Sequence, residues 1–397
     1  ANLDPAAGRT TIELIDEIQE KTGAAVIIIE HRLEDVLWRH VDRVVLMQDG
    51  AIVTDLAPRE LLCGNFLMER GIREPLYLTA LRYAGVPVTP EIGPEHPDTL
   101  TLTDAQKRQV RSWVMDRMEE DKGAKQKKEL LKVEYLSFGY GEGKKNLEDI
   151  HFTIYPGEMV SIVGRNGAGK STLAKLICGF EQPQEGTISF EGRDLSQDTI
   201  KERASYIGYV MQNPNQMIIK DTIKKEVEYA LTIREMPQDT IREKATAALN
   251  ACSLYSMRNW PVDTVSYGQK KRITVASILV LEPDVLILDE PSAGQDYKSY
   301  TEIMKFINVL NREYGKTILF ITHDMHLALE NTERAIVFSD GEVIADDKVF
   351  AVLANDGVIS RANLKQTSLY TLAKHLGLEP EQVTRRFIAH EREARKA

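Results

Sequence analysis

A glycine-rich segment between a predicted strand and a predicted helix constrains the fold of this chain more than any other feature. Residues 159–163 form an apolar, β-branched run, and residues 173–178 continue in a helical pattern. The segment between them reads Gly164-Arg165-Asn166-Gly167-Ala168-Gly169-Lys170-Ser171-Thr172. This is a complete phosphate-binding loop in the strand, loop and helix context that the motif requires. The chain is therefore predicted to contain an α/β domain with a polyphosphate site.

The residue types in and after this loop indicate a specific chemistry. Glycines let successive N–H groups point inward, and the N-terminus of the following helix adds positive potential. We expect Lys170 to reach the β- and γ-phosphates and the Ser171 hydroxyl to bind Mg²⁺. Downstream, the buried-strand run 285–288 ends at Asp289 and Glu290. We expect Asp289 to order the water shell of Mg²⁺ and Glu290 to polarise the attacking water.

An internal repeat organises the rest of the chain. Residues 2–85, here called the first repeat, run parallel to residues 294–377, the second repeat. Each has a helical pattern ended by glycine, then a β-branched run predicted as a strand (25–30 and 317–322), then two strands joined by an Asp-Gly turn. Each also has an aspartate 27 residues before a histidine, in the pairs Asp4 with His31 and Asp296 with His323.

Residues 89–130, which follow the first repeat, are predicted to be a linker. Four prolines between residues 87 and 97 exclude a continuous helix or a central strand. A helix is predicted next, because Thr103 and Gln106 have the spacing of a capping box. Its apolar face would comprise Val110, Trp113, Val114 and Met118. The lysine-rich segment 122–128 is interpreted as a solvated tether, with a binding patch as the alternative.

Residues 265–269 read Val265-Ser266-Tyr267-Gly268-Gln269, and with them the chain resembles the ATP-binding cassette (ABC) family. The family signature, Leu-Ser-Gly-Gly-Gln, likewise stands shortly before the carboxylate strand. The resemblance covers residues 131–353 in full and residues 1–62 as the tail of a second cassette. It implies an α/β P-loop NTPase fold, with a RecA-like core, an antiparallel β subdomain and a helical subdomain, plus a partial second copy. It also implies an ATPase that uses ATP and Mg²⁺.

The resemblance implies roles for further residues. Tyr140 would stack on adenine, Gln212 would sense Mg²⁺ and the membrane partner, and His323 would be the switch histidine. In isolation, Tyr140 would more often be a core aromatic and His323 a packed or capping histidine. The recurrence of His323 as His31 favours a γ-phosphate contact. The expected catalytic residues are Glu290, His323, Lys170 and Gln212, the Mg²⁺ ligands Ser171, Gln212 and Asp289, and the nucleotide-binding residues Tyr140, Gly164, Asn166, Gly167, Gly169, Lys170, Ser171, Thr172, Ser266, Gly268, Gln269 and Asp296.

The chain departs from the family pattern at two positions. Tyr267 replaces the first signature glycine, and Gln295 replaces an apolar residue in the loop after the carboxylates. Since neither change removes a catalytic group, we interpret both as tuning. The run 212–216 (Gln-Asn-Pro-Asn-Gln) and the signature tyrosine look like those of ATPases from energy-coupling factor (ECF) importers. This similarity implies micronutrient uptake, with an integral-membrane ECF transmembrane subunit and a substrate-binding membrane subunit as partners.

Head-to-tail pairing of ABC cassettes has a consequence for this chain. We read its start as a cut in a longer protein, with the first cassette represented only by its C-terminal part. The expected divisions are 1–88 for that part with a helical extension, 89–130 for the linker, 131–355 for the complete second cassette and 356–397 for a C-terminal helical extension. The second cassette would pair with the first in the full-length protein or with a second copy here. The chain alone is expected to hydrolyse ATP slowly.

Two other classes of function remain as alternatives. A soluble twin-cassette factor that acts on the ribosome would use the basic segment 122–128. However, 60 acidic against 50 basic residues give a net charge of −10, which argues against a nucleic-acid partner. A nucleotide sensor without turnover would rest on Tyr267 and Gln295. No stretch reaches the roughly 18 apolar residues of a membrane helix. The chain is therefore not expected to cross a bilayer itself, and the resemblance to ECF ATPases implies a peripheral protein on the cytoplasmic face of the cell membrane.

Overall fold

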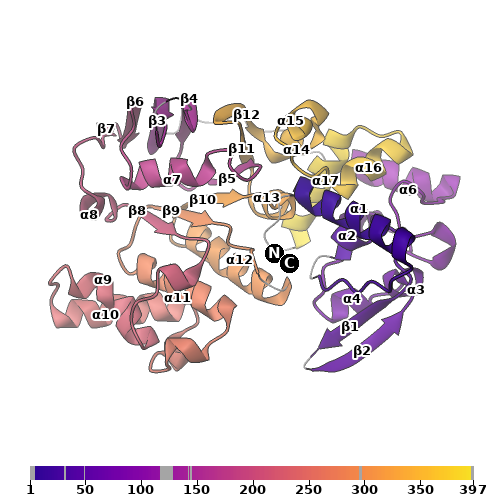
Figure 1. The fold of residues 1–397 in the computed structure, drawn as a ribbon, viewed down its shortest axis with the longest axis horizontal. Helices are drawn as coiled ribbons and strands as arrows, with labels where there is room; N and C mark the ends of the chain where they lie inside the picture. The colour runs from indigo at the N-terminus through magenta and orange to yellow at the C-terminus, as the bar shows by residue number, and fades with distance from the viewer. Residues whose placement is uncertain are drawn as a thin grey trace.

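The computed structural model describes residues 5–30, 33–48, 50–116, 128–141, 143, 145–294 and 297–394. In these residues the strands form a six-stranded, a four-stranded and a two-stranded sheet. Figure 1 shows the six-stranded sheet between the four-stranded sheet and a helical group. That group consists of α9 (Ile223–Thr232), α10 (Gln238–Ala251) and α11 (Tyr267–Leu279).

The six-stranded sheet positions the residues that follow its strands. Its order is β12 (Glu342–Lys348), β11 (Arg334–Ser339), β5 (Met159–Gly164), β10 (Thr317–Thr322), β9 (Val285–Asp289) and β8 (Ile207–Val210). All neighbours are parallel except β12, which pairs antiparallel with β11. Strands β9 and β10 are buried along their whole length, which explains their continuous apolar sequence. The carboxyl ends of β5, β9 and β10 therefore meet at one edge.

The four-stranded sheet and two helices complete this part of the fold. The sheet has the order β4 (Leu147–Ile154), β3 (Leu131–Phe138), β6 (Glu185–Phe190) and β7 (Arg193–Asp194), and every pair is antiparallel. Helix α7 (Lys170–Cys178) follows β5, and α8 (Ile200–Arg203) precedes β8. Within the described residues, 3₁₀ turns lie at η2 (Pro214–Gln216), η3 (Tyr255–Met257) and η4 (Val262–Thr264), and another, η1 (Pro90–Ile92), lies in the linker. The predicted α/β fold, with a parallel core, an antiparallel subdomain and a helical subdomain, is confirmed.

The two repeats form matching elements at most positions. The first repeat and the linker contain α1 (Pro5–Thr22), α2 (Leu33–Val36), the hairpin β1 (Val44–Gln48) and β2 (Ala51–Leu56), α3 (Pro58–Leu62), α4 (Phe66–Glu69), α5 (Leu76–Tyr83) and α6 (Asp104–Met115). The second repeat and the C-terminal tail contain α12 (Tyr297–Arg312), β10, α13 (Met325–Asn331), the hairpin β11 and β12, α14 (Val349–Ala354), α15 (Asp356–Arg361), α16 (Ser368–Leu376) and α17 (Pro380–Ala394).

One predicted strand of the first repeat is wrong. Residues 25–30 have no regular secondary structure, and Ile27 and Ile29 are 89% and 90% exposed. The equivalent run of the second repeat, β10, is hydrogen-bonded to β5 on one side and β9 on the other. No strand of the described residues flanks the run 25–30, so its β-branched sequence is not sufficient to form a strand.

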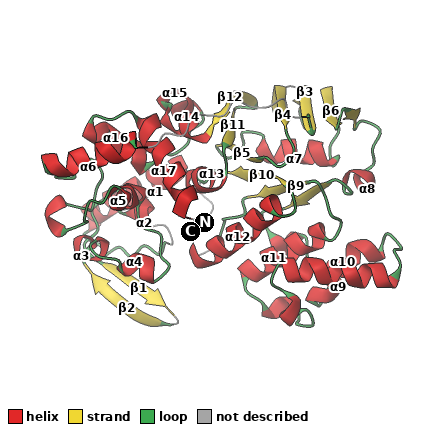
Figure 2. Ribbon diagram, turned by 180° about the vertical axis from the view of Figure 1, so that it is seen from behind, coloured by secondary structure: helices red, strands yellow, loops and turns green. Residues whose placement is uncertain are grey.

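The helical tails of the two repeats share one hydrophobic core. Helix α5 packs against α16, and the backbone N–H of Tyr77 donates to Ser368 Oγ at 3.3 Å. The ring of Tyr83 stacks on His390 of α17 with centroids 4.0 Å apart. Figure 2 shows α5, α6, α16 and α17 gathered on one side of the molecule. The predicted capping box of α6 is present at Thr103, while Met118 lies outside the described residues.

Candidate nucleotide site

The phosphate-binding loop requires glycine at two positions for steric reasons. At Gly164, φ is 153°, and a Cβ atom would lie 2.3 Å from the carbonyl oxygen of Phe338. At Gly169, φ is 102°, and a Cβ atom would lie 2.4 Å from Cδ2 of Leu147. Both φ values belong to the region that favours glycine. The buried Nζ of Lys170 donates to the carbonyl oxygen of Gly164 at 2.7 Å, so the lysine is held at the loop that it follows.

A cavity of about 380 Å³ lies at the carboxyl edge of the six-stranded sheet. It is lined by Asn146, Asn166, Gly167, Gly169, Lys170, Ser171, Thr172, Gln212, Asp289, Glu290 and His323. All of these except Asn146 were predicted as site residues. They meet because β5, β9 and β10 are parallel, and residues that follow parallel strands gather in the crevice at the same edge. The cavity therefore joins the phosphate loop to both carboxylates.

Asp289 lies beside the first residues of α7. Ser171 Oγ donates to Asp289 Oδ2 at 3.1 Å, and the hydroxyl of Tyr209 donates to the same oxygen at 2.8 Å. Burial raises the pKa of Asp289, and the hydrogen bond from Tyr209 acts in the opposite direction. Gln212 lines the same cavity. Mg²⁺ prefers oxygen ligands, such as those of hydroxyl, carboxylate and amide groups. One or two carboxylates together with the phosphates of a substrate are usually enough to bind it. These residues therefore fit a Mg²⁺-bound nucleotide.

Glu290 and His323 form a buried pair at the same edge. His323 Nδ1 lies 2.6 Å from Glu290 Oε1, and the backbone N–H of His323 donates to the same oxygen at 3.1 Å. Thr322 Oγ1 donates to the other carboxylate oxygen at 3.1 Å. Glu290 itself has φ of 45°, a left-handed conformation that turns it out of the line of β9. Three donors thus fix the carboxylate at the cavity wall, in a position from which it can accept a proton.

Lys271 is a buried cation that the sequence did not reveal. Its Nζ donates to the carbonyl oxygen of Glu290 at 2.6 Å, so it supports the left-handed backbone at that residue. Burial lowers the pKa of Lys271 to about 8, although Glu290 and Asp289 act in the opposite direction. The side chain comes from α11, the helix that the signature segment begins. Lys271 therefore connects the helical subdomain to the base of the cavity.

Lys271 is expected to make stability depend on alkaline pH. The pKa is about 8 in the folded protein against 10.5 ordinarily, so between these values the unfolded chain binds more protons. The free energy of unfolding should therefore rise with pH in this window, by about 3 kcal/mol relative to Lys271→Met. Urea unfolding of both proteins at pH 8 and pH 10.5 measures this difference. The same substitution at the exposed Lys224 is the control, and a constant difference between wild type and Lys271→Met would contradict the prediction.

The signature residues lie apart from the cavity. Ser266 caps α11, and its hydroxyl accepts a hydrogen bond from the backbone N–H of Gln269 at 3.3 Å. Ser266, Gly268 and Gln269 are not among the residues that line the cavity. Tyr267 turns toward its own domain, where its hydroxyl donates to the carbonyl oxygen of Gln212 at 3.3 Å. Within the described residues, the phosphate loop and the signature do not form one site.

Tyr140 is close to the cavity without lining it. The residue is 53% exposed, and its ring packs edge-on against Phe138 at 4.9 Å between centroids. Its backbone N–H donates to Asn146 Oδ1 at 3.1 Å, and Asn146 lines the cavity. Lys175 Nζ lies 5.6 Å from the centroid of the ring. The ring is therefore accessible at the rim, as a stacking platform requires, and it is not a core aromatic.

Four positions singled out in the sequence lie outside the described residues, namely Asp4, His31, Gln295 and Asp296, and so do residues 122–127 of the lysine-rich segment. Three residues of the site were missed: Asn146, Tyr209 and Lys271. Tyr209 lies on β8 and donates its hydroxyl to Asp289, and Lys271 lies on α11 and donates to the backbone of Glu290. Neither residue belongs to a short motif. Asn146 precedes β4 in a turn. The sequence carries no local signal for these contacts, because each depends on elements that are far apart along the chain.

The phosphate loop, the paired carboxylates and the parallel sheet define a P-loop nucleotide-binding fold. Comparison with known proteins narrows the class. The model of the family described as ABC transporter matches residues 147–293. A second model, described as ATP-binding cassette cobalt transporter, matches residues 64–138.

Relatives and solved structures agree with these matches. A protein of Enterococcus faecalis, named "Putative ABC transporter ATP-binding protein", is 53% identical over 401 residues, covering 100% of this chain and 69% of the relative. A protein of the same description from Clostridium perfringens is 50% identical, with the same coverage. The structure of cbiO1 from Clostridium perfringens, described as part of the ABC transporter complex cbiONQ, has a TM-score of 0.55 and 34% identity, covering 60% of this chain and 95% of its own.

A second solved structure bears on the chemistry. The ATP-binding cassette MJ0796, described as a dimer in a post-hydrolysis state bound to ADP and Pi, has a TM-score of 0.51 and 30% identity, covering 55% of this chain and 99% of its own. The chain belongs to the family of ABC transporter ATP-binding proteins. It is an ATP-binding subunit and an ATPase. Among the described residues, no helix combines the length and the apolar character needed to cross a bilayer.

Proposed function

We propose that this chain is part of the ATP-binding subunit that powers import of a vitamin or a metal ion through an ECF-type transporter. The observation that carries the proposal is the match of residues 64–138 to the model described as ATP-binding cassette cobalt transporter. This segment ends before the first cavity residue, Asn146, so the match is independent of the general nucleotide-binding machinery. The likeness to cbiO1, which is described as part of the ABC transporter complex cbiONQ, supports the same proposal.

The proposal includes two cassettes in one protein, the first of which this chain contains only in its C-terminal part. The matched helices, the matched hairpins and the shared core of α5 and α16 support a duplication. Relatives that extend beyond this chain offer the length for the rest of the first cassette. The domain boundaries 1–88, 89–130, 131–355 and 356–397 remain part of the proposal.

The roles of the site residues follow from the same proposal. Lys170 contacts the β- and γ-phosphates, Glu290 accepts a proton from the attacking water, and His323 contacts the γ-phosphate. Mg²⁺ held by Ser171, Asp289 and Gln212 would neutralise phosphate charge. Tyr140 stacks on adenine. The remaining nucleotide contacts, including those made across the paired cassettes, come from Gly164, Asn166, Gly167, Gly169, Thr172, Ser266, Gly268, Gln269 and Asp296.

The proposed partners are an integral-membrane transmembrane subunit and a substrate-binding membrane subunit, contacted from the cytoplasmic face of the membrane. The loop after Gln212 is the proposed contact, and its Ile219 is 62% exposed. Replacing Ile219 with lysine would place a charge in this proposed contact. The alternative, a factor that acts on the ribosome, has no support from a particular contact or comparison.

Affinity purification of the full-length protein from its own cells in mild detergent, followed by mass spectrometry, tests the proposal. We expect small polytopic membrane proteins to copurify, and we expect Ile219→Lys to reduce their yield. Ile200→Lys is the matched control, because Ile200 is similarly exposed, at 48%, but lies on α8. Recovery of ribosomal proteins without membrane proteins would refute the import proposal and favour the alternative.

A further inference from the structure

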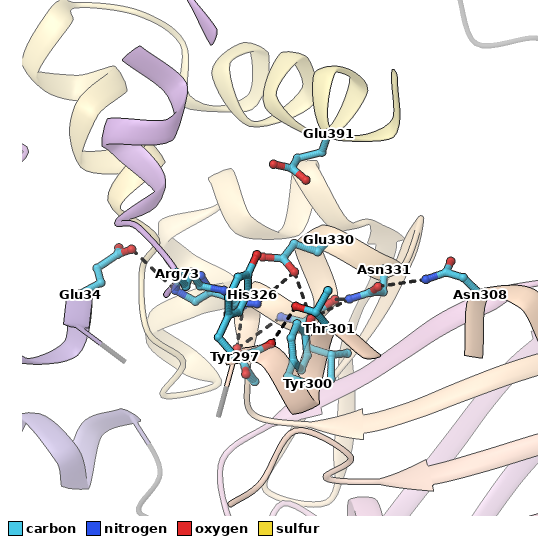
Figure 3. Close-up of polar contacts among 12 residues, drawn as sticks. Glu34, Arg73, Tyr297, Tyr300, Thr301, Asn308, His326, Glu330, Asn331 and Glu391 are labelled. Atoms are coloured by element: carbon cyan, nitrogen blue, oxygen red, sulfur yellow. Dashed lines mark hydrogen bonds and ion pairs between the residues drawn. The ribbon is translucent and has the colours of Figure 1, made fainter. Parts of the chain in front are cut away.

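Arg73 reaches from the segment between α4 and α5 into the second repeat. Its side chain is 15% exposed, and Nη2 lies 3.0 Å from Oε2 of Glu330 on α13, whose side chain is 8% exposed. The guanidinium carbon also lies 4.9 Å from the ring centroid of Tyr297 and 4.8 Å from that of Tyr300, both on α12. Figure 3 shows Arg73 between these aromatic rings and Glu330. One side chain of the first repeat therefore touches two helices of the second.

The contacts around Arg73 continue into a buried polar network. The hydroxyl of Tyr300 donates to Glu330 Oε2 at 3.1 Å, and Asn331 Nδ2 donates to the hydroxyl oxygen of Tyr300 at 2.8 Å. Burial would lower the pKa of Arg73, but Glu330 raises it above its ordinary value, so the guanidinium stays charged. Separating a buried ion pair is unfavourable, because each ion would then be a buried charge without an opposite charge beside it. The network therefore holds α12 and α13 in one fixed relation.

Both helices begin close to the reacting groups of the cavity. Helix α13 begins at Met325, two residues after His323, and α12 begins at Tyr297, seven residues after Glu290. His323 Nδ1 and Glu290 Oε1 are 2.6 Å apart, so a small shift of either helix would change this distance. A second contact of the same kind lies nearby, where His326 Nε2 is 3.9 Å from Oε2 of Glu34. Glu34 and His326 each stand three residues after the paired histidines of the repeats.

We propose that Arg73 is a positioning residue for ATP hydrolysis, by which the first repeat holds α12 and α13 of the second cassette in the geometry that the Glu290–His323 pair requires. Arg73 acts through these helices and touches no nucleotide. The residues that bind the phosphates come from the loop between β5 and α7, and the contacts of Arg73 involve α12 and α13 instead. Loss of Arg73 should therefore lower kcat and leave ATP binding nearly unchanged. The inference rests on ATPase activity and is independent of the import proposal.

The test compares steady-state ATP hydrolysis and equilibrium ATP binding of the full-length protein and its variants. Arg73→Met keeps the length of the side chain and removes its charge, and we expect kcat to fall about 10- to 100-fold, since small misplacements of reacting groups have effects of this size. KM and the dissociation constant of ATP should change less than about twofold, the pattern expected when an interaction matters only for the reaction step. Arg73→Lys should recover part of kcat, because a lysine can still pair with Glu330.

Arg82→Ala is the matched control. Arg82 forms a buried ion pair with Glu74, the residue next to Arg73, with an Nη2 to Oε1 distance of 3.0 Å, but this pair stays within the first repeat. We expect its loss to lower the melting temperature and to leave kcat within about twofold of wild type. An equal loss of kcat in Arg82→Ala and Arg73→Met, or unchanged kcat in Arg73→Met, would overturn the proposal.

A second variant covers the case in which Arg73→Met does not fold. The double variant Arg73→Met/Glu330→Gln removes both charges, so no buried ion is left without a partner. If the two residues act as one unit, the double variant should fold and should show the reduced kcat with unchanged ATP affinity. Wild-type kcat in the folded double variant would overturn the proposal, whatever the single variant does.

Discussion

Glu290→Gln is expected to lower kcat for ATP hydrolysis by about 10²- to 10⁴-fold, the usual contribution of a general base. The amide is isosteric with the carboxylate and still offers an oxygen to Thr322 or to the backbone N–H of His323, so the geometry of the cavity should persist. It cannot take up the proton of the attacking water. ATP binding, measured by titration calorimetry, should therefore stay within about threefold of wild type while turnover is lost.

The control for this substitution is Glu158→Gln. Glu158 immediately precedes β5 at the end opposite the cavity, where its Oε2 lies 3.3 Å from Arg334 Nη1. This variant should hydrolyse ATP at close to the wild-type rate. Unchanged turnover in Glu290→Gln would exclude Glu290 as the general base. If wild type itself showed no turnover above Glu290→Gln, the nucleotide-sensor interpretation would be favoured.

Lys170→Ala is expected to weaken ATP binding by about 10- to 100-fold, because a hydrogen bond to a charged group contributes about 1.5–3 kcal/mol. Nζ of Lys170 is held at the loop by the carbonyl oxygens of Gly164 and Arg165, at 2.7 Å and 2.9 Å, so it is already placed beside the phosphate site. Displacement of a fluorescent ATP analogue measures the effect. The substitution should leave the binding of adenosine, which has no phosphates, unchanged.

Lys244→Ala separates this effect from a general loss of positive charge. Lys244 lies on α10, is partly buried and pairs with Glu282 at 2.7 Å, but it does not line the cavity. ATP affinity in this variant should equal that of wild type. If Lys170→Ala bound ATP as tightly as Lys244→Ala did, the assigned role of Lys170 would be wrong.

The parts of the site that were predictable from sequence depend on short segments. The run from Gly164 to Thr172 contains its own strand end, turn and helix start, so the conformation of the loop is determined locally. Asp289 and Glu290 were predictable because they end a buried strand in a chain that also contains a complete phosphate loop. The contacts of Tyr209, Lys271 and Arg73 were not predictable. Each residue contacts a group that is distant in sequence, and no rule of sequence spacing links the two partners.

The strand predicted at residues 25–30 illustrates the same limit for the fold. Its sequence resembles that of β10 in β-branched content, yet only β10 forms a strand. The difference lies in the neighbours, because β10 hydrogen-bonds to β5 and β9, and a strand is defined by its pairing. Helix α1, whose hydrogen bonds are internal, forms as predicted. Local sequence patterns thus predicted the helices and loops of this chain well, but they did not predict whether a β-branched run joins a sheet.

The exposed run at residues 25–30 has a practical consequence for solution studies of this chain. Its sequence, Ala-Val-Ile-Ile-Ile-Glu, combines high β propensity with a single charge and no proline, which is the composition of segments that aggregate through intermolecular strands. With Ile27 and Ile29 exposed, such pairing needs no prior unfolding. Self-association of this chain should therefore persist without nucleotide and increase with temperature. Ile27→Lys should reduce this self-association, because it places a charge in the exposed run, and it should leave the ATP cavity unchanged.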